Sequence, residues 1–212
     1  MHDVSELVDG YRRFLATRYP EQAGLYRKLA DVGQSPKTMI VACCDSRADP
    51  ATVFDAAPGQ LFVVRNVANL VPSFEGEGLY HGTSAAIEFA VTGLGIENIV
   101  VMGHARCGGV RAFLDGLSNP PRQRGFIDRW LSLLTAAGAE ALRDTAGQGM
   151  EARQQALEHA SVRHSLRNLE TFPFIRERVA AGRLHLHGAY FDIADGRLLG
   201  LDQDNGWFTA VA

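Results

Sequence analysis

The chain turns abruptly from apolar to polar within Thr38-Met39-Ile40-Val41-Ala42-Cys43-Cys44-Asp45-Ser46-Arg47. Its first six residues form a nearly continuous apolar run, which is typical of a strand buried on both faces of a parallel sheet. Similar short runs follow at 60–65 and 98–103. The sequence therefore predicts a mainly parallel sheet covered by helices, with polar side chains emerging where its strands end.

Helices are expected between and after these strands. Residues 84–91 are rich in Ala at helical spacing and suit the crossover that a parallel pair of strands requires. Further helices are predicted at 108–116, 123–135, 151–170 and 173–181. The Ala- and Gly-rich stretch 135–149 is expected to be the loosest part of the chain. Alternation at 184–191, followed by Gly196 and 198–201, predicts a closing hairpin.

The first residues predict an amphipathic helix over 3–17, whose apolar stripe needs a covering surface on the same domain or on a neighbouring subunit. The stripe consists of Val4, Leu7, Val8, Tyr11, Phe14 and Leu15. Residues 1–35 are expected to form a helical arm and residues 36–212 an α/β core, together making one domain. The predicted fold class is α/β: a mainly parallel central sheet flanked by helices, with an extended N-terminal helix and a C-terminal hairpin.

Composition narrows the class of protein. The 212 residues carry a net charge of −3 without a block of Lys and Arg, which argues against nucleic acid or an anionic membrane surface as the main partner. No apolar run approaches the ~18 residues of a membrane span, and the first residues lack the profile of a signal peptide, so the cytoplasm is the expected compartment. Three cysteines, two of them adjacent, cannot make a disulfide framework and point to thiol chemistry or metal binding.

A second polar segment, Gly103-His104-Ala105-Arg106-Cys107-Gly108-Gly109, follows the third predicted strand. The carboxyl ends of parallel strands border the ligand crevice of an open α/β sheet, so the two polar segments are expected at one edge. Thiolate and imidazole are preferred ligands of Zn²⁺. Alternate residues of a strand share a face, so Cys43 and Asp45 point one way and Cys44 the other. We therefore predict Cys43, His104 and Cys107 as metal ligands and Cys44 as a small buried residue.

Asp45 is expected at the fourth position of the metal or just beside it. Arg47, two residues further on, can bind the Asp45 carboxylate through two parallel hydrogen bonds and leave room for water at the metal. Released from Arg47, Asp45 would itself become a ligand. The site thus has two predicted states, and a purely structural zinc site, closed by Asp45, is the alternative to a catalytic one.

Three segments together resemble the β-class carbonic anhydrases in order and approximate spacing. They are Cys43-Cys44-Asp45-Ser46-Arg47, Phe62-Val63-Val64-Arg65-Asn66-Val67-Ala68-Asn69 and Gly103-His104-Ala105-Arg106-Cys107-Gly108-Gly109. The resemblance extends through 161–169 to the closing hairpin, so it covers almost the whole chain. The chain is similar to the plant-type members, since Ile40 stands where the bicarbonate-regulated branch carries a Trp.

The resemblance implies a Zn²⁺ site formed by Cys43, His104 and Cys107, with Asp45 and Arg47 as the catalytic pair beside the bound water. It also implies substrate contacts from a side-chain amide, a backbone N–H and three apolar residues. These are Gln34, the N–H of Gly108, and Phe62, Val67 and Phe89, the last of which replaces the tyrosine of the plant-type pattern.

The activity implied by the resemblance is the reversible hydration of CO2 to bicarbonate and a proton, by attack of zinc-bound hydroxide on CO2. This is the reaction of a carbonate dehydratase, a lyase. Two alternatives stay open: hydrolysis of carbonyl sulfide or carbon disulfide on the same zinc site, and zinc binding or a redox response without turnover. The expected partners are the small-molecule substrate and further copies of the chain, as a homodimer or an assembly of dimers, with the N-terminal stripe as a subunit contact.

Overall fold

The computed structural model describes residues 4–75, 82–118 and 125–211. The chain divides into two compact units, Met1–Ser35 and Pro36–Ala212. In the described residues, no helix has both the length and the apolar character that crossing a bilayer requires.

The N-terminal unit consists of two helices, α1 (Val4–Ala16) and α2 (Arg18–Val32). The helix predicted over 3–17 is confirmed as α1, and α2 is an addition that the sequence pattern did not predict. Neither helix has a buried residue, and the apolar stripe of α1 is exposed apart from Phe14, which is half-buried. The ring of Phe14 meets those of Tyr19 and Tyr26 at centroid distances of 5.9 and 6.0 Å. An aromatic cluster, rather than a buried core, therefore joins the two helices.

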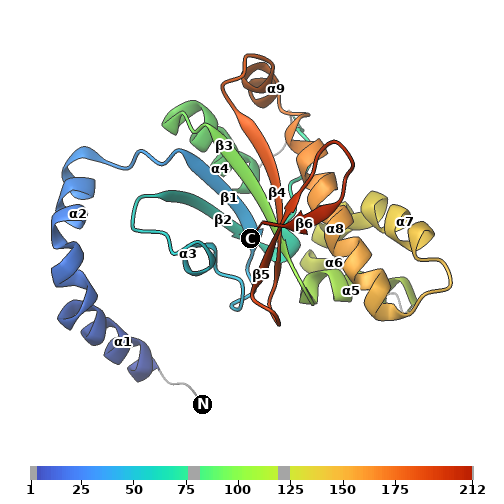
Figure 1. Ribbon diagram of the computed structural model, residues 1–212, viewed down its shortest axis with the longest axis horizontal. Helices are drawn as coiled ribbons and strands as arrows, with labels where there is room; N and C mark the ends of the chain where they lie inside the picture. Colours follow the sequence, from blue (N-terminus) through green and yellow to red (C-terminus); the bar gives the residue numbers. More distant parts are fainter. Residues whose placement is uncertain (1–3, 76–81, 119–124, 212) are drawn as a thin grey trace. The chain divides into compact units, whose positions relative to one another are not determined.

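The second unit is built on a sheet whose described strands are six, in the order β2-β1-β3-β4-β5-β6 (Figure 1). The strands are β1 (Thr38–Cys43), β2 (Leu61–Asn66), β3 (Asn98–His104), β4 (His185–Asp192), β5 (Arg197–Leu201) and β6 (Phe208–Ala210). The first four run parallel, whereas β5 and β6 add antiparallel pairs. The predicted α/β fold with its closing hairpin is confirmed. Because β1 and β3 are neighbours, the segments that follow them emerge side by side at one edge.

Helices connect and cover these strands. They are α3 (Pro50–Val53), α4 (Gly82–Glu88) with its π-helical continuation η2 (Phe89–Leu94), α5 (Gly108–Ser118), α6 (Phe126–Leu131), α7 (Thr135–Asp144), α8 (Met150–Leu169) and α9 (Pro173–Ala180), with 3₁₀ turns η1 (Val67–Asn69) and η3 (Ser132–Leu134). In Figure 1, α5 to α8 gather on one side of the sheet. The predicted helices are confirmed to within a few residues, except for the one over 123–135. Its predicted start lies outside the described residues, and α6, which begins at Phe126, gives way to a 3₁₀ turn at Ser132.

The prediction that 135–149 is the loosest stretch is wrong, because α7 occupies Thr135–Asp144. Three of its small residues are buried: Ala137, Gly138 and Ala141. A Cβ atom on Gly138 would lie 2.6 Å from the ring of Phe113. The small side chains therefore serve close packing between helices, which composition alone does not distinguish from flexibility.

Two glycines let α8 lie close to the sheet. A Cβ atom on Gly103 of β3 would lie 2.8 Å from Val162 of α8, and one on Gly188 of β4 would lie 3.1 Å from the same side chain. Val162 is fully buried, so it has no free space into which to withdraw. This close approach fixes α8 against β3 and β4 and brings its first half beside the segment that follows β3.

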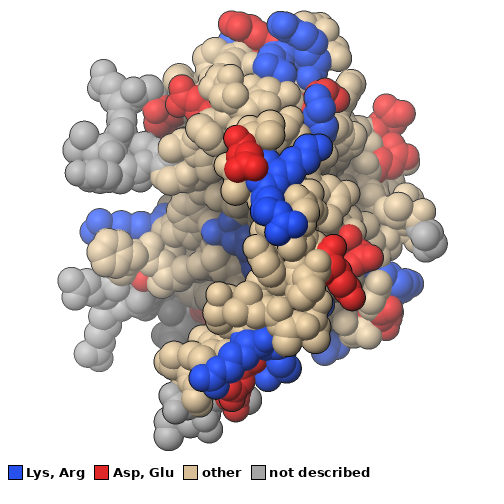
Figure 2. Space-filling view, turned by 90° about the vertical axis from the view of Figure 1, so that its left-hand side faces the viewer, with Lys and Arg blue, Asp and Glu red and all other residues tan. Residues whose placement is uncertain are grey.

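The surface mixes charges of both signs. On the face drawn in Figure 2, basic and acidic side chains are interspersed. Ion pairs of the described residues include Lys37 with Glu97 at 2.6 Å and Arg163 with Glu140 at 3.0 Å. This mixture agrees with the sequence, in which Lys and Arg form no block.

Candidate metal centre

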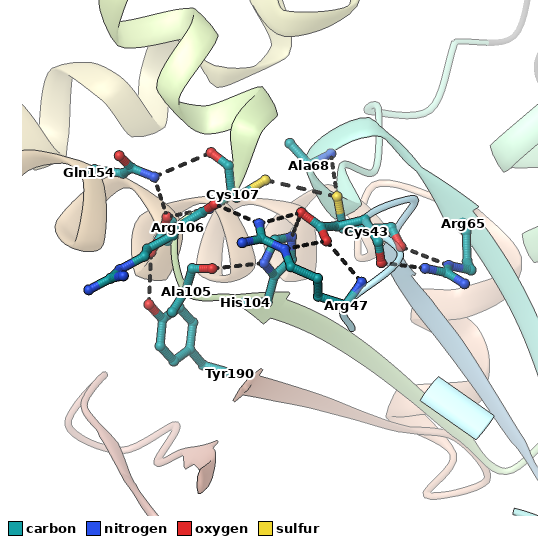
Figure 3. A network of polar contacts seen from close by, with 12 residues as sticks. Cys43, Arg47, Arg65, Ala68, His104, Ala105, Arg106, Cys107, Gln154 and Tyr190 are labelled. Atoms are coloured by element: carbon teal, nitrogen blue, oxygen red, sulfur yellow. Dashed lines mark hydrogen bonds and ion pairs between the residues drawn. The ribbon is translucent and has the colours of Figure 1, made fainter. Parts of the chain in front are cut away.

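Three side chains converge where β1 and β3 end. Cys43 is the last residue of β1, His104 is the last of β3, and Cys107 directly precedes α5. One ligand atom from each lies within 4.8 Å of the others, and the two Sγ atoms are 3.9 Å apart (Figure 3). All three residues are buried. The structure thus brings together the donors that the sequence placed at one edge of the sheet.

The His104 ring is oriented to offer a lone pair to this cluster. Its Nδ1 lies 3.0 Å from the carbonyl oxygen of Ala105, which can only accept, so Nδ1 is protonated and donates a hydrogen bond to that oxygen. Its Nε2 is buried and has no hydrogen-bond partner in the described residues. Leaving a buried polar atom unpaired is unfavourable unless something binds it. An imidazole nitrogen and two sulfurs form a donor set that fits Zn²⁺, so the residues present suit the metal.

The sulfurs of Cys43 and Cys107 are within hydrogen-bonding distance, with their Sγ atoms 3.9 Å apart, so one thiol can donate its proton to the other sulfur. A hydrogen bond with Cys107 lowers the pKa of Cys43. The same hydrogen bond, together with burial, raises the pKa of Cys107. A cation between the sulfurs would replace the hydrogen-bonded proton and allow both groups to ionise. The electrostatics of the pair therefore favour a bound cation.

Asp45 lies beside the three donors but faces Arg47. The guanidinium Nε and Nη2 of Arg47 donate to Oδ1 and Oδ2 of Asp45 at 2.9 and 2.7 Å. The Arg47 backbone N–H also donates to Oδ1 at 3.0 Å. These hydrogen bonds hold the pKa of Asp45 well below its usual range. Oδ2 is 3.9 Å from Nε2 of His104, so of the two predicted states the structure has the one in which Arg47 binds Asp45.

The predicted burial of Cys44 is wrong, because this residue is exposed. Its backbone N–H still donates to the carbonyl oxygen of Asn66 at 2.9 Å, so the chain continues along β2 past the end of β1. Cys44 does point away from Cys43, as alternation along a strand predicts. Beyond the end of β1, however, no packed element of the described residues covers the side to which Cys44 points, so the residue is exposed. Cys44 instead borders a cavity of about 810 Å³ whose other walls include Val67 and Trp130.

Two of the predicted substrate-binding residues lie next to the three donors. Gly108 follows Cys107 and is the first residue of α5. Val67 begins the η1 turn, and its side chain packs so closely on Gly109 that a Cβ there would lie 2.7 Å away. Trp130 of α6 donates its indole N–H to the Val67 carbonyl oxygen at 2.8 Å. Val67 is therefore held between α5 and α6.

Phe62 and Phe89 are not brought to the three donors within one chain. Their rings contact each other with centroids 5.9 Å apart. Phe62 pairs with Met39, four positions before Cys43, which places it about 13 Å down the strand at the usual rise per residue. Gln34 belongs to the N-terminal unit, and its substrate contact stays a prediction.

Arg65 is a residue of the site that the sequence argument missed. Its Nε donates to the carbonyl oxygen of Cys43 at 2.8 Å and its Nη2 to that of Asp45 at 2.6 Å. Its Nη1 donates to Asp49 at 3.0 Å. Figure 3 shows this side chain reaching from β2 to the backbone of the neighbouring segment. The available signal in the sequence was an arginine directly after the apolar run 61–64.

Glu158 of α8 was missed as well. It is 3% exposed, and one carboxylate oxygen accepts the backbone N–H of Cys107 at 2.8 Å. Gln154 donates to the same oxygen at 2.9 Å, and the hydroxyl of Tyr190 donates to the other carboxylate oxygen at 2.7 Å. Burial raises the pKa of Glu158. The feature that could have identified Glu158 is its place in α8, where a carboxylate stands among buried residues, Leu157 and Ser161 among them.

Comparison with known proteins identifies the family. Residues 38–198 match the family model described as carbonic anhydrase. Beta carbonic anhydrase 5, chloroplastic, of Arabidopsis thaliana is 39% identical over 190 residues, which make up 88% of this chain and 62% of that protein. The chain belongs to the β-class carbonic anhydrase family.

Solved β-carbonic anhydrases share its architecture. The β-carbonic anhydrase CcaA has a TM-score of 0.91 and 29% identity, covering 98% of this chain and 92% of its own. A β-carbonic anhydrase of Sordaria macrospora, one of two described as tetrameric, has a TM-score of 0.82 and 30% identity, covering 97% and 98%. The chain spans less than two thirds of the Arabidopsis relative but nearly all of both solved structures. The matched range contains Cys43, Asp45, His104 and Cys107, whereas Gln34 precedes it.

Proposed function

We propose that this chain binds Zn²⁺ through Cys43, His104 and Cys107 and catalyses the reversible hydration of CO2 to bicarbonate and a proton. The observation that carries the proposal is the buried Nε2 of His104, which has no hydrogen-bond partner among the described residues and lies beside two sulfurs that are 3.9 Å apart. With three protein donors, a bound Zn²⁺ would have a ligand position left for water, as in catalytic zinc sites. A bound Zn²⁺ supplies Lewis acidity, which makes water a nucleophile near neutral pH.

Asp45 orients the reacting water in this proposal. Because Arg47 keeps its pKa well below the usual range, Asp45 stays ionised and can only accept hydrogen bonds. A carboxylate of such low basicity does not retain a proton near neutral pH. Asp45 therefore acts as an acceptor that fixes the direction of the water, and Arg47 keeps the carboxylate off the metal.

The substrate would lie against Val67, with the backbone N–H of Gly108 available to an oxygen on which negative charge develops. Phe62 and Phe89 lie away from the donors of their own chain, and Phe89 is 52% exposed. If they line a substrate pocket, it is that of a second subunit. We therefore propose a homodimer or an assembly of dimers, in line with the tetrameric relative from Sordaria macrospora.

Stopped-flow CO2 hydration on protein of known zinc content tests the proposed function. We expect hydration that rises with pH and disappears on chelation of the metal. Asp45→Ala should retain zinc and lose activity, whereas loss of zinc from this variant would indicate a closed, structural site. Zinc-loaded wild-type protein that hydrates no CO2 would refute the assignment.

A further inference from the structure

The backbone between His104 and Cys107 is strained. Arg106 has φ = +56°, in the left-handed region that residues with a Cβ rarely adopt. Its side chain is exposed, and its ion-pair partner Glu151, 3.9 Å away, is more exposed still. The side chain thus gives no reason for this conformation. Strained residues persist only where the surroundings hold them.

Helix α8 holds the peptide groups of Cys107 from one side. Glu158 accepts the Cys107 N–H at 2.8 Å, and Gln154 donates to the Cys107 carbonyl oxygen at 3.3 Å. Gln154 also donates to Glu158 at 2.9 Å, so the two side chains, four residues apart on one helix face, act together. Figure 3 shows Gln154 and Tyr190 beside this segment, on the side away from Arg65.

Glu158 is itself fixed. Tyr190 of β4 donates its hydroxyl to the second carboxylate oxygen at 2.7 Å, and the glycine contacts described above hold α8 close to β3 and β4. The carboxylate thus accepts hydrogen bonds on both oxygens from a helix, a strand and the Cys107 peptide. Such a buried, fully satisfied network is rigid.

We propose that Glu158 is a positioning residue for the metal centre: its carboxylate holds the strained turn at Arg106 so that the Cys107 sulfur stays beside Cys43 and His104. It touches neither the metal position nor the substrate. The inference rests on the proposed zinc site, but its test needs no turnover. A loosened turn would let the Cys107 sulfur leave the metal more often, so the rate of metal release reports on the role of Glu158.

Release of zinc to a chelating dye is measured for loaded wild-type protein and variants. Glu158→Leu removes the acceptor at similar volume and should release zinc at least tenfold faster. Glu158→Gln keeps an oxygen for the Cys107 N–H and should restore a rate within threefold of wild type. The matched control is Glu140→Leu, which removes a carboxylate that pairs with Arg163 and Arg167 and should leave release unchanged.

The variant Arg106→Gly distinguishes a positioning role of Glu158 at the turn from an effect of Glu158 on the overall stability of the fold. Glycine adopts positive φ without strain, so the turn no longer needs to be held. In this background Glu158→Leu should accelerate release less than threefold. Equal acceleration in both backgrounds, or acceleration by Glu140→Leu, would overturn the proposal, because Glu158 would then act only through overall stability.

If Glu158→Leu does not fold, Gln154→Leu provides the test. It removes the donor to the Cys107 carbonyl oxygen and to Glu158, and we expect zinc release to be about threefold faster with an unchanged melting temperature. Unchanged release would overturn the proposal. A wild-type protein that binds zinc but hydrates no CO2 would refute the proposed function alone, since release is measured without substrate.

Discussion

At Asp45, three hydrogen bonds from Arg47, two of them from its guanidinium, keep the carboxylate charged and its pKa well below the usual range. In the unfolded chain its pKa is about 4, so the pair stabilises the fold above that pH. This stabilisation disappears as the pH falls through the lowered folded-state pKa. The unfolding free energy of metal-free wild type should therefore exceed that of Arg47→Ala near neutral pH, and the difference should shrink below about pH 4. Urea unfolding at a series of pH values measures this difference.

The control for that comparison is Arg197→Ala, which removes an exposed ion pair with Asp195 and should change stability little. In zinc-loaded protein, Arg47→Ala should also lower kcat/KM by roughly tenfold to a hundredfold, the usual effect of misplacing a reacting group. A stability difference that does not change between neutral and acidic pH would contradict this account of Asp45.

At the scale of elements, the contact of α8 with β3 depends on the missing side chain of Gly103. In Gly103→Ala the new Cβ would meet the buried Val162 at 2.8 Å, and we expect a loss of about 1–3 kcal/mol in unfolding free energy from overpacking. Gly103→Ala/Val162→Ala should recover part of it. The control is Gly116→Ala in α5, where a Cβ meets open space. The higher helix propensity of alanine should raise the unfolding free energy of this variant by roughly 0.5–1 kcal/mol. Denaturant unfolding measures these free energies. An unfolding free energy that Gly103→Ala leaves unchanged would show that α8 can shift freely.

At the scale of the whole molecule, the described buried apolar clusters belong to the second unit, whereas α1 and α2 bury no residue. A fragment of residues 36–212 should therefore fold and bind zinc without the N-terminal unit. If the exposed stripe of α1 is a subunit contact, the fragment should form a smaller assembly than the full chain. Circular dichroism, zinc analysis and light scattering measure these properties. An unfolded fragment, or one with an unchanged assembly, would contradict this division of roles.

The sequence by itself determined the sheet, its closing hairpin and the convergence of Cys43, His104 and Cys107. Strand patterns are local, and the ends of neighbouring parallel strands meet at one edge wherever the strands lie in the chain. It also indicated that Arg47 can bind Asp45, because two residues of separation bring such side chains within reach of each other.

Only the tertiary structure decided what packs around that edge. In it, Cys44 is exposed past the end of β1, and the small residues of 135–144 lie in a packed helix. Phe62 and Phe89 contact each other, away from the three donors of their own chain. The tertiary structure also brought Glu158 to Cys107 across 51 residues of sequence. The physical reason is that a strand or helix pattern depends on residues close together in the chain, whereas burial and long-range hydrogen bonds depend on which elements pack against each other.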